Sequence, residues 1–124
     1  MRVSAIPYSD DVLPADISLL QLPDVAKQLG VVVTRVHQML RDHQLIAVKR
    51  SGYLGVPEEF FGPDGNVLKP LPGLISVLRD GGFTETEILR WMFTADDSLP
   101  GTPVAALHGH QAREVVRRAQ AMAF

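Results

Sequence analysis

The chain has 124 residues, of which 46% are hydrophobic and 21% are charged, as expected for one globular domain or a small domain with a helical annex. It contains no cysteine, which excludes disulfides, zinc–thiolate sites, iron–sulfur clusters and thiol catalysis and fits a reducing, cytoplasmic location. No stretch is apolar and long enough for a membrane helix, and the N-terminus lacks the apolar run of a secretory signal.

The formal net charge of −2 is unevenly distributed along the chain. Residues 1–26 carry −3, residues 54–100 carry −5 and residues 101–124 carry +2. The remaining block, residues 27–53, carries +4 because one acid, Asp42, stands against the cations Lys27, Arg35, Arg41, Lys49 and Arg50. A local excess of positive charge suits contacts with phosphates, and a solvated basic surface would give the same pattern.

Residues 1–18 are expected to form a leader without regular structure, because two prolines interrupt it. From Leu22 to Arg41, two runs of apolar residues at helical spacing are separated by Gly30. Glycine permits the left-handed backbone often found just past a helix C-terminus, so the two helices meet at a tight corner. Such a helix-turn-helix is the DNA-reading motif of many regulators. The helices are expected over about Pro23 to Leu29, and from Val33 or Thr34 to about Asp42.

Helical periodicity divides the second helix into two faces. Val36, Met39 and Leu40 lie on the inward face. The outward residues toward the N-terminus are candidates for reading base edges, since that end of a recognition helix approaches the bases: Thr34, His37 and Gln38. The two outward arginines, Arg35 and Arg41, are expected to hold phosphates. His37 is equally compatible with an ordinary, partly exposed surface histidine.

A two-stranded hairpin is expected next, because Leu45–Arg50 and Tyr53–Val56 are apolar and β-branched and only Ser51-Gly52 separates them. A hairpin directly after a recognition helix is the wing of a winged helix. Lys49 and Arg50 at its tip would reach neighbouring phosphates or the minor groove. Tyr53 would lie along the sugar–phosphate backbone or pack across the hairpin.

The breaker cluster Gly62-Pro63-Asp64-Gly65-Asn66 indicates a domain boundary. It divides the chain into a leader (1–18), a winged helix-turn-helix domain (19–62) and a helical C-terminal domain (66–124). The fold class is therefore mainly α with a small two-stranded β-hairpin. In the second half, helices are expected from Leu71 to Arg79, from a Thr84/Glu87 capping box onward, and from about Val104 to Ala123.

Enzymatic chemistry is not expected. The close histidine pair, His108 and His110, would splay apart on a helix, where neighbours are three or four residues apart, so the two rings would not meet at one metal ion. There is no glycine-rich phosphate loop after a strand and no serine nucleophile elbow. The sequence thus predicts no catalytic residue, metal or cofactor.

Four stretches of the second half carry a family resemblance: Leu71-Pro72-Gly73-Leu74, Asp80-Gly81-Gly82, Glu87-Ile88-Leu89-Arg90-Trp91, and His110 to Ala123. With the helix-turn-helix before them, they resemble a small actinobacterial, mycobacterial-type family of DNA-binding proteins with an N-terminal winged helix-turn-helix and a helical C-terminal domain. The resemblance implies binding of double-stranded DNA, as in transcriptional regulators, and no enzymatic activity. A mycobacterial member is linked to a Ser/Thr protein kinase, which makes such a kinase a candidate partner, with Ser4 and Ser9 available. A homodimer is left open.

Two features depart from the family pattern. Val32 and Val33 are apolar where polar residues are usual at the start of a recognition helix, which disfavours base reading from that end. The leader is short, so regulation that depends on a tail is in doubt as well.

An alternative interpretation concerns the second half. Trp91-Met92-Phe93, Leu99 to Pro103 and the following Val- and Ala-rich helix are similar to the toxin-binding domain of a class of helix-turn-helix antitoxins. In that case the C-terminal domain would dock a partner protein while the first half binds DNA.

Overall fold

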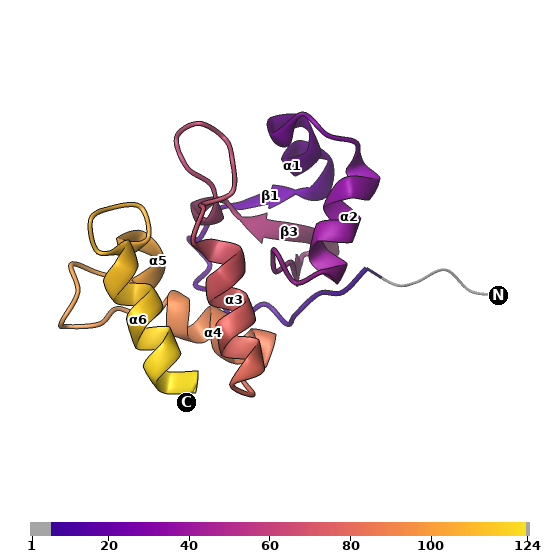
Figure 1. Ribbon diagram of the computed structural model, residues 1–124. Helices are drawn as coiled ribbons and strands as arrows, with labels where there is room; N and C mark the ends of the chain where they lie inside the picture. Colours follow the sequence, from indigo (N-terminus) through magenta and orange to yellow (C-terminus); the bar gives the residue numbers. More distant parts are fainter. Residues whose placement is uncertain (1–5, 124) are drawn as a thin grey trace.

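The computed structural model describes residues 6–123 and contains two packed halves (Figure 1). The winged half comprises β1 (Leu19–Gln21), α1 (Leu22–Leu29), α2 (Val33–Arg41), β2 (Val48–Arg50), β3 (Tyr53–Pro57) and the 3-10 helix η1 (Glu58–Phe60). The second half comprises α3 (Leu71–Asp80), α4 (Glu85–Met92), α5 (Pro103–Ala106) and α6 (Ala112–Ala123). A winged helix-turn-helix followed by a helical C-terminal domain is therefore confirmed.

The sheet has three antiparallel strands in the order β1-β3-β2, one more than predicted. The expected β2–β3 hairpin is present, with Arg50 opposite Tyr53 and both turn residues, Ser51 (φ 50°) and Gly52 (φ 83°), in the left-handed region, as in a type I′ turn. The prediction missed β1, for which the sequence analysis expected no strand. β1 approaches β3 closely because position 55 is glycine: a Cβ there would lie 2.8 Å from Cβ of Leu19.

The leader lies against the winged half. Ser9 forms a parallel bridge with Val48, its N–H donating to Ala47 O (2.8 Å) and its carbonyl accepting from Lys49 N–H (3.3 Å). This short contact covers the outer edge of β2, whose backbone groups would otherwise lack partners. The Ser9 hydroxyl lies 2.9 Å from that of Thr86, at the start of α4. The leader thus connects the wing with the C-terminal domain.

The prediction of one long C-terminal helix from about Val104 to Ala123 was wrong. α5 ends at Ala106, and residues 107–111 form turns before α6 begins at Ala112. Gly109 disfavours a continuous helix by about 1 kcal/mol relative to alanine. In addition, Nε2 of His108 is hydrogen-bonded to the carbonyl of Glu59 (2.7 Å), which holds the turn against η1. Ala105, within α5, is exposed.

One hydrophobic core runs through both halves. Phe60 of η1 is fully buried, and its ring centroid lies 6.0 Å from that of Phe93, just after α4. Just after α2, Nδ1 of His43 lies 3.5 Å from a carboxylate oxygen of Glu85 on α4. Since core residues and polar contacts both cross the junction, the C-terminal domain holds the winged half in a fixed orientation.

Candidate nucleic-acid interface

The helix-turn-helix is shaped by the corner at Gly30. Its φ of 70° is left-handed, as predicted, and its N–H and that of Val31 donate to the carbonyls of Lys27 (3.2 Å) and Ala26 (3.0 Å). These two bonds close α1 in a Schellman motif and satisfy carbonyls that would otherwise lack partners. The inner faces of the two helices are buried: Val25 and Ala26 on α1, and Val36, Met39 and Leu40 on α2. This packing fixes which side chains of α2 face outward.

The outward face of α2 matches the predicted division. Thr34, Arg35 and Gln38 are exposed, whereas His37 and Arg41 are half-buried. α2 lies on the side of the molecule away from α5 and α6 (Figure 1). A duplex could therefore approach α2 without meeting those helices. The amide of Gln38 donates to Asp42 (2.9 Å) on the helix surface, a bond that must open before Gln38 can reach a base.

Lys49 is the exposed cation of the wing. Its Nζ lies 5.6 Å from the centroid of the Tyr8 ring, an arrangement that suits a cation–π interaction. Tyr8 is half exposed itself, so the ring orients the ammonium group without burying it. Lys49 therefore stays available to a phosphate, and Tyr8 is a neighbour that sequence reasoning did not find.

Arg50 has a different environment from Lys49. Its guanidinium forms two hydrogen bonds to the carboxylate of Asp11, from Nε (2.6 Å) and from one terminal nitrogen (3.1 Å). The same group donates to the carbonyls of Ile17 (2.7 Å) and Pro14 (3.4 Å). The hydrogen bonds between the two side chains raise the pKa of Arg50 and hold the pKa of Asp11 below its ordinary value of 3.8. Arg50 thus fastens the leader to β2, and its predicted contact with the DNA backbone stays a prediction.

Tyr53 pairs across the hairpin with Arg50 and is half-buried. This position agrees with packing across the hairpin, which was one of its two predicted roles. Sequence reasoning also left out Lys27 from the candidates, although it is exposed in the last turn of α1. Its place in the helix that precedes the recognition helix was the available signal, since that helix crosses the DNA backbone in this motif.

The structure describes one of the two candidate phosphorylation serines. Ser9 is only 6% exposed and its hydroxyl lies 2.9 Å from that of Thr86, whereas Ser4 lies outside the described residues.

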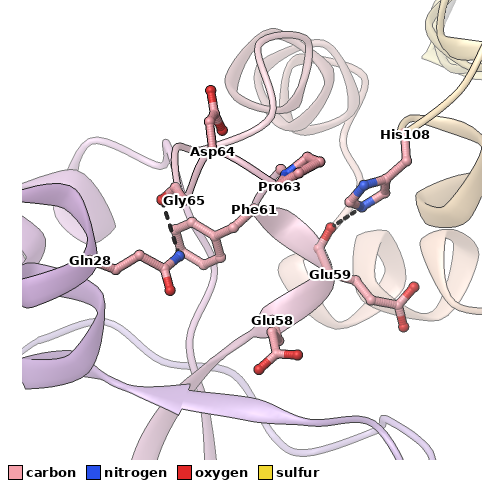
Figure 2. Close-up of a pocket in the computed structure, with 9 residues that line it drawn as sticks. Gln28, Glu58, Glu59, Phe61, Pro63, Asp64, Gly65 and His108 are labelled. Atoms are coloured by element: carbon pink, nitrogen blue, oxygen red, sulfur yellow. Dashed lines mark hydrogen bonds between the residues drawn. The ribbon is translucent and has the colours of Figure 1, made fainter.

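A pocket of about 640 Å³ opens where the two halves meet (Figure 2). The Gln28 side chain, which donates to Gly65 O (3.0 Å), and the His108–Glu59 contact lie in it. The ionisable side chains around it are mostly acidic, namely Glu58, Glu59 and Asp64 beside His108. Carboxylates repel phosphates, so this face is unsuited to nucleic acid and the basic face of α2 is the better candidate.

Within residues 6–123, no three His, Asp or Glu side chains lie close enough together to hold a metal ion. No helix in the same range has the length and apolar character needed to cross a membrane.

Comparisons with known proteins agree with this architecture. Residues 5–61 match the family model "DNA-binding protein Rv2175c, wHTH domain", and residues 68–123 match "Rv2175c C-terminal domain of unknown function". The chain is 52% identical over 135 residues to DNA-binding protein Rv2175c of Mycobacterium tuberculosis (strain ATCC 25618 / H37Rv), covering 99% of this chain and 92% of that protein. It superposes on the NMR structure of Rv2175c with a TM-score of 0.87 and 51% identity, covering 98% of this chain and 92% of the other.

Proposed function

Since the chain belongs to the Rv2175c family of winged helix-turn-helix proteins, we propose that it binds double-stranded DNA in the cytoplasm and regulates transcription there. This is a family of DNA-binding proteins and not of enzymes. The observation that carries the proposal is the outward face of α2, where exposed polar and basic side chains stand on a helix whose other face is fixed in the core. A homodimer, a kinase partner and the docking of a partner protein on the C-terminal domain stay predictions.

In this proposal α2 enters the major groove. Thr34, His37 and Gln38 face base edges, and the amide of Gln38 can exchange its bond to Asp42 for a bidentate pair with adenine. Arg35 and Arg41 flank them and hold phosphates. The wing then lies along the neighbouring backbone, where Lys49 on β2 contributes a further phosphate contact.

The test is a fluorescence anisotropy titration of labelled duplex DNA at several salt concentrations. Neutralising three phosphate contacts in the triple variant Arg35→Ala, Arg41→Ala, Lys49→Ala should flatten the log–log salt dependence by about 3 units. The matched control is Lys69→Ala, Arg90→Ala, Arg113→Ala, which removes the same charge from exposed positions in the second half of the chain. Absence of binding at low salt, or equal slopes for the two triple variants, would contradict the proposal.

Regulation of transcription requires preferred sites. Selection of genomic fragments by the purified protein should enrich a common motif upstream of genes. Uniform recovery of fragments would instead indicate a sequence-independent DNA-binding protein.

A further inference from the structure

Two adjacent exposed valines, Val31 and Val32, lie at the N-terminal end of α2. The proposed function places this end of the helix against DNA. Val32 is 70% exposed and Val31 is 37% exposed, whereas Val33 packs against the core. Val32 is the most exposed of the large hydrophobic side chains in residues 6–123. A valine side chain as exposed as this one contributes little hydrophobic free energy to folding.

Val32 also provides no side-chain cap for α2. Val32 is the N-cap residue of α2, with φ −75° and ψ 154°, and no side chain caps this helix end. Two other helices of the chain begin with a threonine that does cap: Thr84 accepts from Glu87 N–H (3.2 Å) and Thr102 from Ala105 N–H (3.2 Å). α1 and α3 also begin without a side-chain cap, so it is the 70% exposure of Val32, more than the missing cap, that sets this position apart.

The chemistry of valine restricts what it can contact on DNA. Its side chain has no donor or acceptor, so it cannot read the polar groups of a base edge. In the major groove of unmodified DNA, the C5-methyl group of thymine is the apolar feature of the base edges. The first residues of a recognition helix are the ones that reach those edges.

Building on the proposed function, we infer that Val32 reads the C5-methyl group of one thymine in the preferred DNA site. The apolar start of α2 is then a specificity determinant and not a defect of the recognition helix. Burial of two methyl groups against each other should favour thymine over a base without the methyl by on the order of threefold to tenfold.

The experiment uses the full chain and a duplex obtained by selection from random DNA. Each thymine is replaced in turn by deoxyuridine, which removes only the C5-methyl, and the dissociation constant is measured by anisotropy. In the wild-type protein, one replacement should weaken binding by threefold to tenfold. In Val32→Ser, which removes the methyls and supplies a capping hydroxyl, the thymine and deoxyuridine duplexes should bind equally at that position.

Val31→Ser is the matched control, because it changes the neighbouring and less exposed valine; it should keep the wild-type preference for thymine. Thermal unfolding of both variants verifies that they are folded. Equal effects of deoxyuridine in the wild type and in Val32→Ser, or no effect at any thymine, would overturn the assignment of Val32 while leaving DNA binding intact. A wild-type protein that binds no duplex would instead refute the proposed function itself.

Discussion

At Arg50, a structural role and a DNA-binding role predict clearly different experimental results. The sequence groups it with Lys49 as a basic wing tip, yet only Lys49 is exposed. The Arg50 side chain is 18% exposed and its partner Asp11 is 21% exposed. In the variant Arg50→Gln the charge, the two bonds to Asp11 and the bonds to the leader carbonyls are lost or weakened together.

The expected effect is mainly on stability. A charge-assisted hydrogen bond contributes about 1.5 to 3 kcal/mol, and contributions within one cluster are not additive. Because this cluster is near the surface, we expect a loss of about 2 kcal/mol in the free energy of unfolding. For a chain of this length, that corresponds to a decrease in Tm of roughly 6 to 12 °C. Lys49→Gln, the matched control, should lose no more than about 1 kcal/mol, the value of an exposed cation–π contact.

The pH dependence has a definite sign. Asp11 has its pKa lowered in the folded state, so its contribution to stability is present above the ordinary value of 3.8. It is lost as the pH falls through the lower folded-state pKa. The difference in stability between the wild type and Asp11→Asn should therefore be constant near neutral pH and shrink in acid below about pH 4.

Two measurements decide the role of Arg50. Urea unfolding gives the stability of each variant, and anisotropy gives the salt dependence of DNA binding. Lys49→Gln should flatten the salt slope by about 0.9, whereas Arg50→Gln should leave it nearly unchanged. If Arg50→Gln flattened the slope by about 0.9 and kept the wild-type stability, Arg50 would be a phosphate contact and the reasoning above would be refuted.

Two further predictions concern the C-terminal domain. Gly81→Ala should destabilise the protein by about 1 to 3 kcal/mol in urea unfolding, because the new Cβ would lie 2.5 Å from Cβ and 2.6 Å from Cα of Ala123. The control is Gly73→Ala on α3, where a new Cβ would have nothing within 4 Å. This variant should be neutral or stabilising by up to about 1 kcal/mol. Thr84→Ala should lower the free energy of unfolding by about 1 kcal/mol, because it removes one side of the capping box of α4. Thr84→Ser keeps the hydroxyl and should have the wild-type stability. Equal stability of the two variants would show that the cap contributes nothing.

Local signals in the sequence predicted much of the fold. Gly30 between two amphipathic runs, the two-residue turn at Ser51-Gly52 and the Thr84/Glu87 capping box are all complete within a few residues, and all three are present. The features that were missed depend on partners far along the chain. β1 is a strand because β3 lies beside it, and a three-residue segment has no alternation by which to recognise it.

The same distinction applies to the candidate interface. Helical periodicity identified the outward face of α2, since periodicity is a local property. Periodicity gave no indication that Arg50 is hydrogen-bonded to Asp11, which is 39 residues away in the sequence. Nor does the apolar character of Val32 distinguish an exposed side chain from a buried one. Its exposure follows from the packing of α1 against α2, which the sequence pattern does not specify in detail.

The ion pair between Arg50 and Asp11 lowers the positive charge that the winged half presents to DNA. The block of residues 27–53 carries +4 by sequence, but Arg50 is neutralised by Asp11, which lies outside the block. The exposed cations that remain toward DNA are few, and acidic groups line the pocket at the domain junction. Sequence-independent attraction to phosphates should accordingly be modest, and its dependence on salt should be shallow. In the proposed function, affinity at physiological salt should then depend mainly on base-edge contacts made by α2, so substitutions at Val32 and Thr34 should weaken binding more than substitutions in the wing.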